Sequence, residues 1–437
     1  MEKLMIYMPS ITPRADYIFT LVFRDLIGAD LVLTSHRDEF LSYTGPRIEY
    51  ATEPSGNGIF IRAHGLLNED AIRPQILFFS SFRDCPAFFA TRDDRSAFPF
   101  DPFATAFYLV TRYEEYLSFE PDKFGRFKAA DSIAAAGNFL KIPVVNIWAG
   151  LLRDHIIQVY PGLRFREKKF RFVPTIDIDH AYAYKQRRFL RTMGGYGRSL
   201  FGGKWGKVIQ RTNVLLGLQK DPYDSYDYLK EIHDRYGLQP LYFVLFASHG
   251  KDDNNVSLSH KGFRELLRWL DQSETTGIHP SLTSTRHPRA LNSEIKGLSR
   301  ILHREIRISR QHFLKTSFPE TYRQLLKHGI TDDYSLGYAT DPGFRAGIAD
   351  PFPFFDLKRN HVTTLVLHPV TLMDVTLKDY CRVSPAEAME IVRSFHDAIK
   401  AIKGEFITVW HNESFDERGK WKGWTKVYEE MLEYCHD

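Results

Sequence analysis

Long hydrophobic runs, paired cysteines, internal repeats and a strong charge bias are all missing from this chain of 437 residues. No run of about 18 apolar residues occurs, so no membrane-spanning helix is expected. Cys85, Cys381 and Cys435 are far apart and form no C-x-x-C pair, which argues against a disulfide scaffold and fits a reducing compartment. The net charge of +4 comes from interleaved basic and acidic residues, so no nucleic-acid partner is expected.

The beginning of the sequence, MEKLMIYMPSITPR, does not read as a secretion signal. It has an acidic residue at position 2, and Pro9 and Pro13 break the apolar stretch early. The cytoplasm is therefore the expected location. A hydrophobic content of 43% and a charged content of 26% are typical of a globular protein with a sizeable core. A basic cluster at 185–198 fits a solvated helix end and loop better than a contact with a glycan, a phosphate or a membrane.

The pattern of the sequence changes near residue 165, which predicts two units, 1–165 and 166–437. In the first unit, short runs rich in Ile, Val, Phe and Tyr alternate with turn residues and are followed by two helical segments. This pattern predicts a smaller α/β unit, to which the sequence assigns no role. The expected strands are 4–8, 29–35, 47–51, 58–64 and 75–81, and the expected helices are 101–117 and 138–160.

In the second unit, strands and helices alternate about seven times, which predicts a parallel sheet covered by helices, either a barrel or a doubly wound sheet. The fold class is therefore α/β. The expected strands are 169–179, 240–247, 277–282, 305–313, 330–338, 363–369 and 405–412. The expected helices are 225–237, 259–273, 291–303, 319–329 and 384–404.

Two aspartates end the first strand of this unit, in FVPTIDID at 172–179. Because side chains alternate along a strand, Asp177 and Asp179 face the same side. Two carboxylates so close together raise each other's pKa unless a cation compensates for their charge. The pattern indicates a metal site, although a strand that simply leaves the core for a polar loop would look the same.

Other strands of the unit also end in histidine or arginine. His279 and His411 each end a strand, His368 follows four apolar residues, and Arg310 and His312 are spaced to share one strand face. A single histidine beside an apolar strand is usually a core residue. Several of them at the carboxyl edge, where βα enzymes carry their active sites, predict a functional site.

In order, T-x-D-x-D, G-I-H-x-S, an arginine-bearing strand, L-x-L-H-P and a final strand resemble the polysaccharide deacetylases of carbohydrate esterase family 4. The resemblance covers about residues 170 to 415 and leaves the first third outside. It implies a distorted (β/α)7 barrel that holds one divalent metal, generally zinc, and removes acetyl groups from N-acetylated sugars.

The resemblance also implies a role for individual residues. Asp177 would be the general base and Asp179 a metal ligand, in a D-x-D form where most members have adjacent aspartates. His279 would be the first metal-binding histidine. Arg310 would keep the base charged, and His368 would be the general acid.

Two departures from the family pattern affect the ligand set and the arginine. Thr283 stands where the family usually has a second metal-binding histidine. His312 is the preferred substitute, because it would share a strand face with Arg310; His287 or a water molecule are the alternatives. The usual R-x-P-Y is replaced by Arg-Gln-His-Phe at 310–313, which weakens the assignment of Arg310.

Several residues keep more than one interpretation. His411 is a second acid, a substrate contact or a residue hydrogen-bonded within its loop. Asp332 and Asp333 either contribute to a groove or cap a strand. In the rim segment 341–357, Arg345 is a candidate contact for an anionic group. The segments 111–117 and 122–127 of the first unit are candidates for contact with the barrel or a substrate.

Three functions are compatible with these residues. The first is a metal-dependent deacetylase that acts on an N-acetylated glycan or glycolipid precursor. The second is a barrel that has kept the carbohydrate groove without turnover and serves as a glycan-binding or assembly protein, for which Thr283 is the best support. The third is hydrolysis of another amide or ester by the same metal centre.

Overall fold

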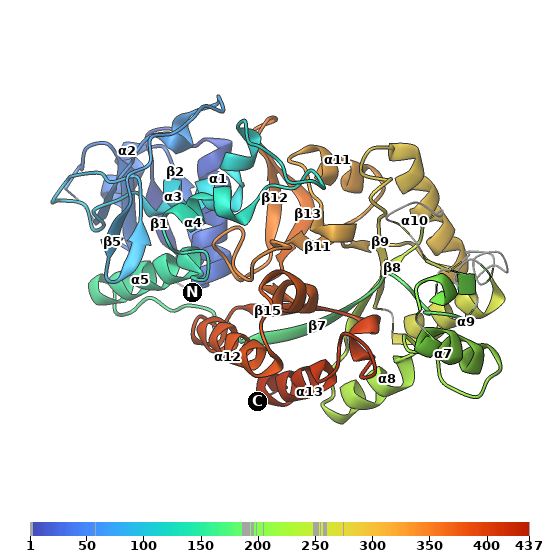
Figure 1. Cartoon of the computed structure of the whole chain (residues 1–437). Coiled ribbons are helices and arrows are strands. Elements are labelled where there is room, and N and C mark those ends of the chain that lie inside the picture. The colour runs from blue at the N-terminus through green and yellow to red at the C-terminus, as the bar shows by residue number, and fades with distance from the viewer. Residues whose placement is uncertain are drawn as a thin grey trace.

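The computed structural model describes residues 3–436 except 57, 186–192, 194–195, 198, 204, 248–252, 254, 257–259 and 274. Most of the basic cluster expected at 185–198 therefore lies outside the described residues. Figure 1 shows a smaller amino-terminal unit, in blue and cyan, beside a larger unit whose sheet is surrounded by helices. No described helix is long and apolar enough to cross a membrane.

The amino-terminal unit is built on a parallel four-stranded sheet in the order β2-β1-β3-β4. Four of the five expected strands and both expected helices are confirmed. The strands are β1 (Leu4–Tyr7), β2 (Leu31–Thr34), β3 (Arg47–Ala51) and β4 (Ile59–Arg62). The helices are α1 (Pro13–Phe19), α2 (Arg37–Ser42), α3 (Pro102–Val110), α4 (Ile133–Ala136) and α5 (Val144–Val159).

Two features of this unit differ from expectation. The predicted strand at 75–81 is wrong: only the short hairpin of β5 (Ser80–Phe82) and β6 (Cys85–Ala87) forms there. Helix α1 was not predicted, because Pro13 was interpreted only as a break. Proline is well tolerated at the first helical position, and Thr12 caps the helix by accepting a hydrogen bond from the Ala15 amide.

The larger sheet forms a distorted barrel, and its strand order is β12-β13-β11-β10-β9-β8-β7-β15-β14. All neighbours are parallel except β12 and β13. The α/β class and the barrel are thus confirmed. The strands are β7 (Arg171–Ile178), β8 (Leu241–Leu245), β9 (Thr276–His279), β10 (Ile308–Ser309), β11 (Asp332–Leu336), β12 (Phe352–Asp356), β13 (His361–Pro369), β14 (Leu372–Met373) and β15 (Glu405–His411).

The barrel is drawn together where β13 continues into β14. The amide of Val370 donates to the Leu336 carbonyl of β11, and the next amide, Thr371, donates to the Ile407 carbonyl of β15. One continuous segment therefore joins the two sides of the barrel, so β7, β8, β9, β10, β11, β13 with β14, and β15 act as seven strands.

Helices cover the outside of this barrel (Figure 1). The five expected helices of the second unit are confirmed as α8 to α12. The described helices are α7 (Trp205–Leu215), α8 (Tyr226–Arg235), α9 (Lys261–Leu270), α10 (Pro288–Leu302), α11 (Glu320–Lys327), α12 (Pro385–Ala401) and α13 (Trp424–His436). Helix α12 begins with a capping box in which Ser384 and Glu387 bond each other's backbone amides.

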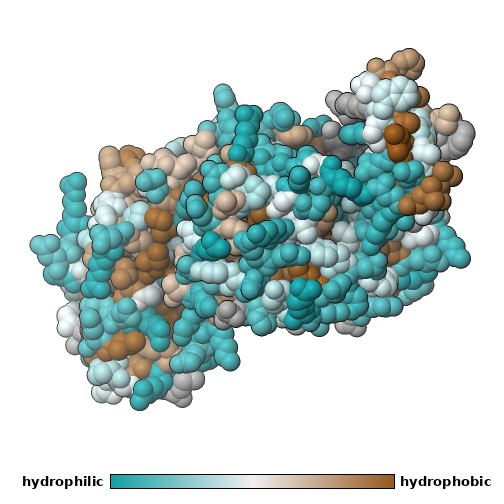
Figure 2. Space-filling view, turned by 60° about the horizontal axis from the view of Figure 1, so that its bottom comes forward, coloured by the Kyte–Doolittle hydropathy of each residue, from teal (hydrophilic) through white to brown (hydrophobic). Residues whose placement is uncertain are grey.

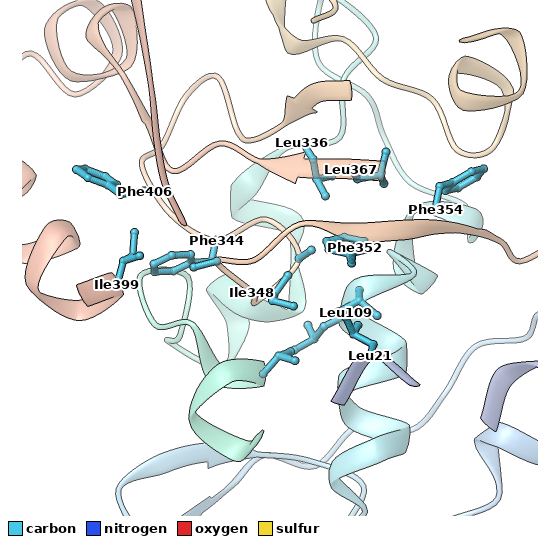
Figure 3. Packing of buried hydrophobic residues seen from close by; sticks show 14 of the residues in the cluster. Leu21, Leu109, Leu336, Phe344, Ile348, Phe352, Phe354, Leu367, Ile399 and Phe406 are labelled. Carbon is cyan, nitrogen blue, oxygen red and sulfur yellow. The ribbon is translucent and has the colours of Figure 1, made fainter. Parts of the chain in front are cut away.

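A continuous hydrophobic core joins the two units. Figure 3 shows Leu21 and Leu109 of the amino-terminal unit close to Ile348 and Phe352 of the barrel. Strand β12, which was expected to belong to a rim loop, instead forms the antiparallel edge of the barrel sheet next to this contact. The division near residue 165 thus separates two sheets that share one core.

Buried ion pairs also join the units. They account for the 111–117 segment and for Arg345 of the 341–357 segment, whose roles the sequence left open. Arg112 of the 111–117 segment donates to Glu115 over 2.8 Å and to the carbonyl of Arg345. Arg345 in turn donates to Glu115 over 2.6 Å and is 2% exposed. Its guanidinium is therefore used within the protein, and the interpretation of Arg345 as a contact for an anionic substrate group is wrong.

Candidate metal centre and acid–base site

The carboxyl ends of three strands bring the predicted residues together. Asp177 lies near the end of β7 and is paired in register with His411 at the end of β15. His279 ends β9. Because neighbouring parallel strands end at one edge, their last side chains form a cluster there, as in other βα barrels.

Asp177 is held by a fully buried arginine. The Nη1 atom of Arg310 donates to Asp177 Oδ1 over 2.7 Å and to the Thr175 hydroxyl over 2.7 Å. Arg310 Nε donates to the Tyr334 carbonyl, and the guanidinium lies 4.3 Å from the centre of the Phe243 ring. Such an enclosed arginine fixes the orientation of the carboxylate. The structure thus brings Arg310 to the position that the sequence analysis gave it.

Within the described part of the chain, one group of three side chains, Asp179, His279 and His312, has the spacing of a metal site, with ligand atoms all within 4.8 Å of one another. Asp179 Oδ1 lies 3.3 Å from His279 Nε2, and Asp179 Oδ2 lies 3.4 Å from His312 Nε2. Asp179 Oδ1 is buried and has no hydrogen-bond partner. A buried carboxylate oxygen without a partner, facing two imidazole nitrogens, fits a divalent cation.

The outer nitrogen of each histidine is already bonded, which directs the inner nitrogen to the site. His279 Nδ1 lies 2.6 Å from the Arg310 carbonyl, so this nitrogen carries the proton and Nε2 keeps its lone pair. His312 Nδ1 lies 3.0 Å from Asp253 Oδ1. Hydrogen bonds of this kind orient metal-binding histidines and increase their basicity.

Thr283 supports the second histidine from outside. Its hydroxyl and amide donate to Asp253 Oδ2 over 3.0 and 3.1 Å, and the Leu282 amide donates to Asp253 Oδ1. The residue in the place of the usual histidine therefore fixes the carboxylate that orients His312. The other substitute considered, His287, precedes α10 as its N-cap residue and is not part of the group.

The reason given for choosing His312 needs correction. Strand β10 ends at Ser309, so Arg310 and His312 do not share a strand face. His312 instead begins a 3-10 turn in which Phe313 has a left-handed backbone, with φ of 60°. This turn, and not strand alternation, carries the imidazole to the site.

The 122–127 segment of the amino-terminal unit supports the same turn. Arg126 Nη1 donates to the Phe313 carbonyl over 3.1 Å, and the Phe124 ring stacks on Phe313 at 4.7 Å. Phe313 stacks in turn on His312 at 4.1 Å. The amino-terminal unit thus contacts Phe313, the neighbour of His312 in this turn, and forms part of the wall beside the site.

Negative charge dominates around the group. Burial by itself lowers the pKa of an imidazole, but the carboxylates of Asp179 and Asp253 raise the pKa of His312 to about 9. Burial by itself raises the pKa of a carboxyl, yet His312 and His279 hold the pKa of Asp179 well below its usual range. The pocket therefore attracts a positive charge, either a proton on His312 or a metal ion.

His411 lies opposite these residues and is bonded to an aspartate that the sequence analysis did not single out. Its Nδ1 is 2.8 Å from Asp374 Oδ1, and its Nε2 is 3.9 Å from Asp179 Oδ2. Asp374 is also bonded by the His411 amide and the Ser414 hydroxyl. Burial by itself lowers the pKa of an imidazole. The carboxylate of Asp374, together with those of Asp179 and Asp177, nevertheless raises the pKa of His411 to about 10.

The structure does not bring His368 to this cluster. Its Nε2 lies 2.8 Å from Asp332 Oδ1, and its Nδ1 lies 3.8 Å from Glu405 Oε2. Glu405 begins β15, whereas His411 ends it, so the two histidines lie at opposite ends of the barrel. His368 also stacks on the Tyr334 ring at 4.1 Å, and no contact joins it to Asp177, Asp179 or His411 among the described residues. The structure thus gives His368 the partners Asp332 and Glu405 instead of a place beside Asp177, and its role as the general acid stays a prediction.

Asp332 and Asp333 also have structural partners. Asp332 pairs with His368, as described, and Asp333 accepts hydrogen bonds from the hydroxyls of Ser309 and Ser335 over 2.7 and 2.9 Å. Asp333 is fully buried. Of the two interpretations given for this pair, the strand-supporting one fits these contacts.

Comparisons with known proteins add the following. Residues 4–161 match the model of a family of unknown function, DUF7033. A search of curated proteins gave no match. Similar solved structures include proteins named as polysaccharide deacetylases from Mycobacterium smegmatis (16% identity, TM-score 0.41, 62% of this chain and 86% of that one) and Pseudomonas aeruginosa (10%, 0.38, 69% and 90%). A polysaccharide deacetylase from Bacillus cereus has 10% identity and a TM-score of 0.28, over 47% of this chain and 80% of that one. At these low scores the likenesses carry no argument about the reaction, which depends on the geometry of the site.

Replacing Asp253 by Asn is expected to weaken metal binding about 10- to 100-fold, because His312 loses the carboxylate that orients it and raises its basicity. The measurement is a competition titration of Zn²⁺ against a chelating dye. Asp227→Asn, which removes a carboxylate on an exposed helix position, is the matched control and should bind like the wild type. Equal affinity in all three proteins would contradict the role given to Asp253.

Proposed function

We propose that this protein is a metal-dependent hydrolase that removes an acetyl group from an N-acetylated sugar of a glycan or glycolipid precursor. The observation that carries the proposal is the arrangement of three parts at one edge of the barrel. These parts are a carboxylate held by Arg310, a group of one carboxylate and two imidazoles, and the imidazole of His411 bonded to Asp374. Hydrolysis of an amide requires a base, an electrophile and an acid in such an arrangement.

The metal would be held by Asp179, His279 and His312. Two imidazoles and one carboxylate are a ligand set that suits Zn²⁺, and three protein ligands leave a position open, as catalytic zinc sites do. A divalent ion bound there would polarise the acetyl carbonyl and make water a better nucleophile at neutral pH. Thr283, Asp253 and the Arg310 carbonyl would keep the two imidazoles in place.

The proton transfers would be divided between Asp177 and His411. Asp177, oriented by Arg310, would take a proton from the attacking water. His411, whose pKa is raised to about 10 by its carboxylate neighbours in spite of burial, would carry a proton at neutral pH. It would deliver that proton to the departing amine nitrogen, which cannot leave as an anion. In this proposal His411 replaces His368 as the acid.

The alternative of a glycan-binding barrel without turnover loses its main support. It depended on Thr283 in the place of a metal ligand, and His312 offers an imidazole nitrogen to the same group. A location in the cytoplasm is proposed with the function, supported by three cysteines that are all free.

Metal analysis and acetate release test the proposal together. The purified protein is expected to contain about one divalent ion per chain and to release acetate from N-acetylated oligosaccharides. Removal of the ion with a chelator should abolish release, and added Zn²⁺ should restore it. A chain that binds one ion but releases no acyl group from any N-acetylated sugar tested would contradict the proposed reaction.

A further inference from the structure

Helix α7 presents an apolar face to solvent. Trp205 is 64% exposed and Ile209 is 60% exposed. Phe201, which precedes the helix, is 96% exposed, and Leu216 and Leu218, which follow it, are 68% and 75% exposed. Figure 2 shows brown, hydrophobic atoms at the projecting end of the molecule where Figure 1 places α7. These five residues are called the α7 apolar face below. Isolated exposed apolar residues are normal, but a cluster of large ones marks an interaction surface.

Contacts on the other side of the helix hold this face outward. Gln210 Oε1 accepts a hydrogen bond from the Tyr184 hydroxyl over 2.9 Å, and the Thr212 and Tyr196 hydroxyls are 2.9 Å apart. The Arg211 guanidinium lies 5.1 Å from the centre of the Tyr184 ring. The inward side of α7 therefore combines these polar contacts with the buried Val214. Turning the apolar face inward would break these contacts.

Positive charge accompanies the apolar face. The sequence has no Asp or Glu from 181 to 220. Among the described residues, Lys207 lies on α7 itself and Lys220 follows it. Lys207 also lines a cavity of about 750 Å³ together with Arg418 and Lys420 from the loop before α13. Lys220, Arg418 and Lys420 are paired with Asp227, Asp416 and Asp379. Complementarity to a negatively charged partner therefore rests on the excess of basic residues in 181–220, which holds nine Lys and Arg and no acidic residue.

We propose that the α7 apolar face docks on the surface of an anionic lipid bilayer. A helix with Trp, Phe and Leu on one side and Lys and Arg beside them is the signature of a segment that lies in the membrane interface. Of the five apolar side chains only Ile209 reaches the rim of the cavity beside α7, and the others are at least 64% exposed, which suits insertion between lipid head groups better than the binding of a peptide (Figure 2). The protein would lie on the membrane without crossing it.

This placement stands whichever reaction the barrel performs. Helix α7 belongs to the connection that leaves the carboxyl end of β7, and the same edge of the barrel carries Asp177 and Asp179. Docking through α7 would therefore bring that edge toward the lipid surface. In a cell, the cytoplasmic leaflet supplies the negative surface charge that attracts such basic segments.

Co-sedimentation with lipid vesicles tests the proposal on the full chain. We expect binding to vesicles of phosphatidylcholine mixed with phosphatidylglycerol to be at least about tenfold stronger than to phosphatidylcholine alone. The triple variant Phe201→Ser, Trp205→Ser, Ile209→Ser should lose at least about tenfold in binding to the mixed vesicles, since it removes the inserted side chains. The fluorescence of Trp205 in the wild type should shift to shorter wavelength when these vesicles are added.

The control is the double variant Ile76→Ser, Phe78→Ser, which removes apolar side chains that are 78% and 76% exposed on the amino-terminal unit. It should bind like the wild type. Circular dichroism of both variants checks that they are folded. Failure of the wild type to bind mixed vesicles, or equal binding by the triple variant, overturns the proposal. A vesicle-independent dimer that the triple variant dissociates would also overturn it, because a second copy would then cover the face.

Discussion

The variant Asp177→Asn is expected to lose about a thousandfold or more in acetate release while it keeps its metal ion. The carboxylate accepts its hydrogen bond from Arg310 through Oδ1, and an asparagine oxygen can accept the same bond. Geometry is thus largely preserved, but the amide cannot take a proton from water. Because Asp177 is not in the three-residue metal group, metal content should stay near one ion per chain.

Two measurements separate this loss from a loss of folding. Arg310 would be buried opposite a neutral side chain, so a lower melting temperature is expected and assays are run well below it. Metal content by elemental analysis shows whether the neighbouring site is intact. A variant that folds, holds its ion and releases acetate at the wild-type rate would remove Asp177 from the mechanism.

The general course of the fold was predictable because hydrophobic periodicity is a local property of the sequence. The runs before Asp177 and His411 are largely apolar and short, so each indicates a buried strand, and His279 lies in a short segment between two helical patterns where a strand is expected. Parallel strands align their carboxyl ends. Helices α8 to α12 follow from their amphipathic patterns in the same way. Asp177, Asp179 and His279 could therefore be assigned to one edge before any coordinates were considered.

The remaining residues depend on contacts that no local pattern encodes. Asp253 lies in the polar stretch GKDDNN, and nothing there distinguishes it from a solvated loop residue. Asp374 follows the two-residue strand β14, which is too short to give a periodic signal. Pro369 after His368 indicates the end of a strand. The chain nevertheless crosses there to the other side of the barrel and continues through β14 to Asp374.

The change at the ligand position illustrates how the same geometry arises from different segments. In the family that this chain resembles, both histidines come from one motif. In this chain His279 ends β9, and His312 comes from the turn after β10 and is held by Asp253 and Thr283. The sequence can identify a missing ligand, whereas only the fold identifies its replacement.

Replacing each of the two candidate acids separately by glutamine gives the second large effect. His411→Gln is expected to slow acetate release from an N-acetylated sugar about 10²- to 10⁴-fold, because the amine can no longer receive a proton as it leaves. His368→Gln is expected to leave the rate nearly unchanged. Its imidazole bonds Asp332 near the opposite end of the barrel, so its loss affects stability and not proton transfer.

The choice of leaving group shows whether His411 acts as an acid or only holds the structure. Para-nitrophenyl acetate releases a phenolate that needs no proton, so His411→Gln should hydrolyse it at close to the wild-type rate. A merely structural defect would slow both substrates equally, and the metal content would fall with them. If His368→Gln lost the amide reaction while His411→Gln kept it, the acid would be His368 and the assignment of His411 would be wrong. The substrate pair therefore tests the assignment of the acid and the arrangement of the barrel in one experiment.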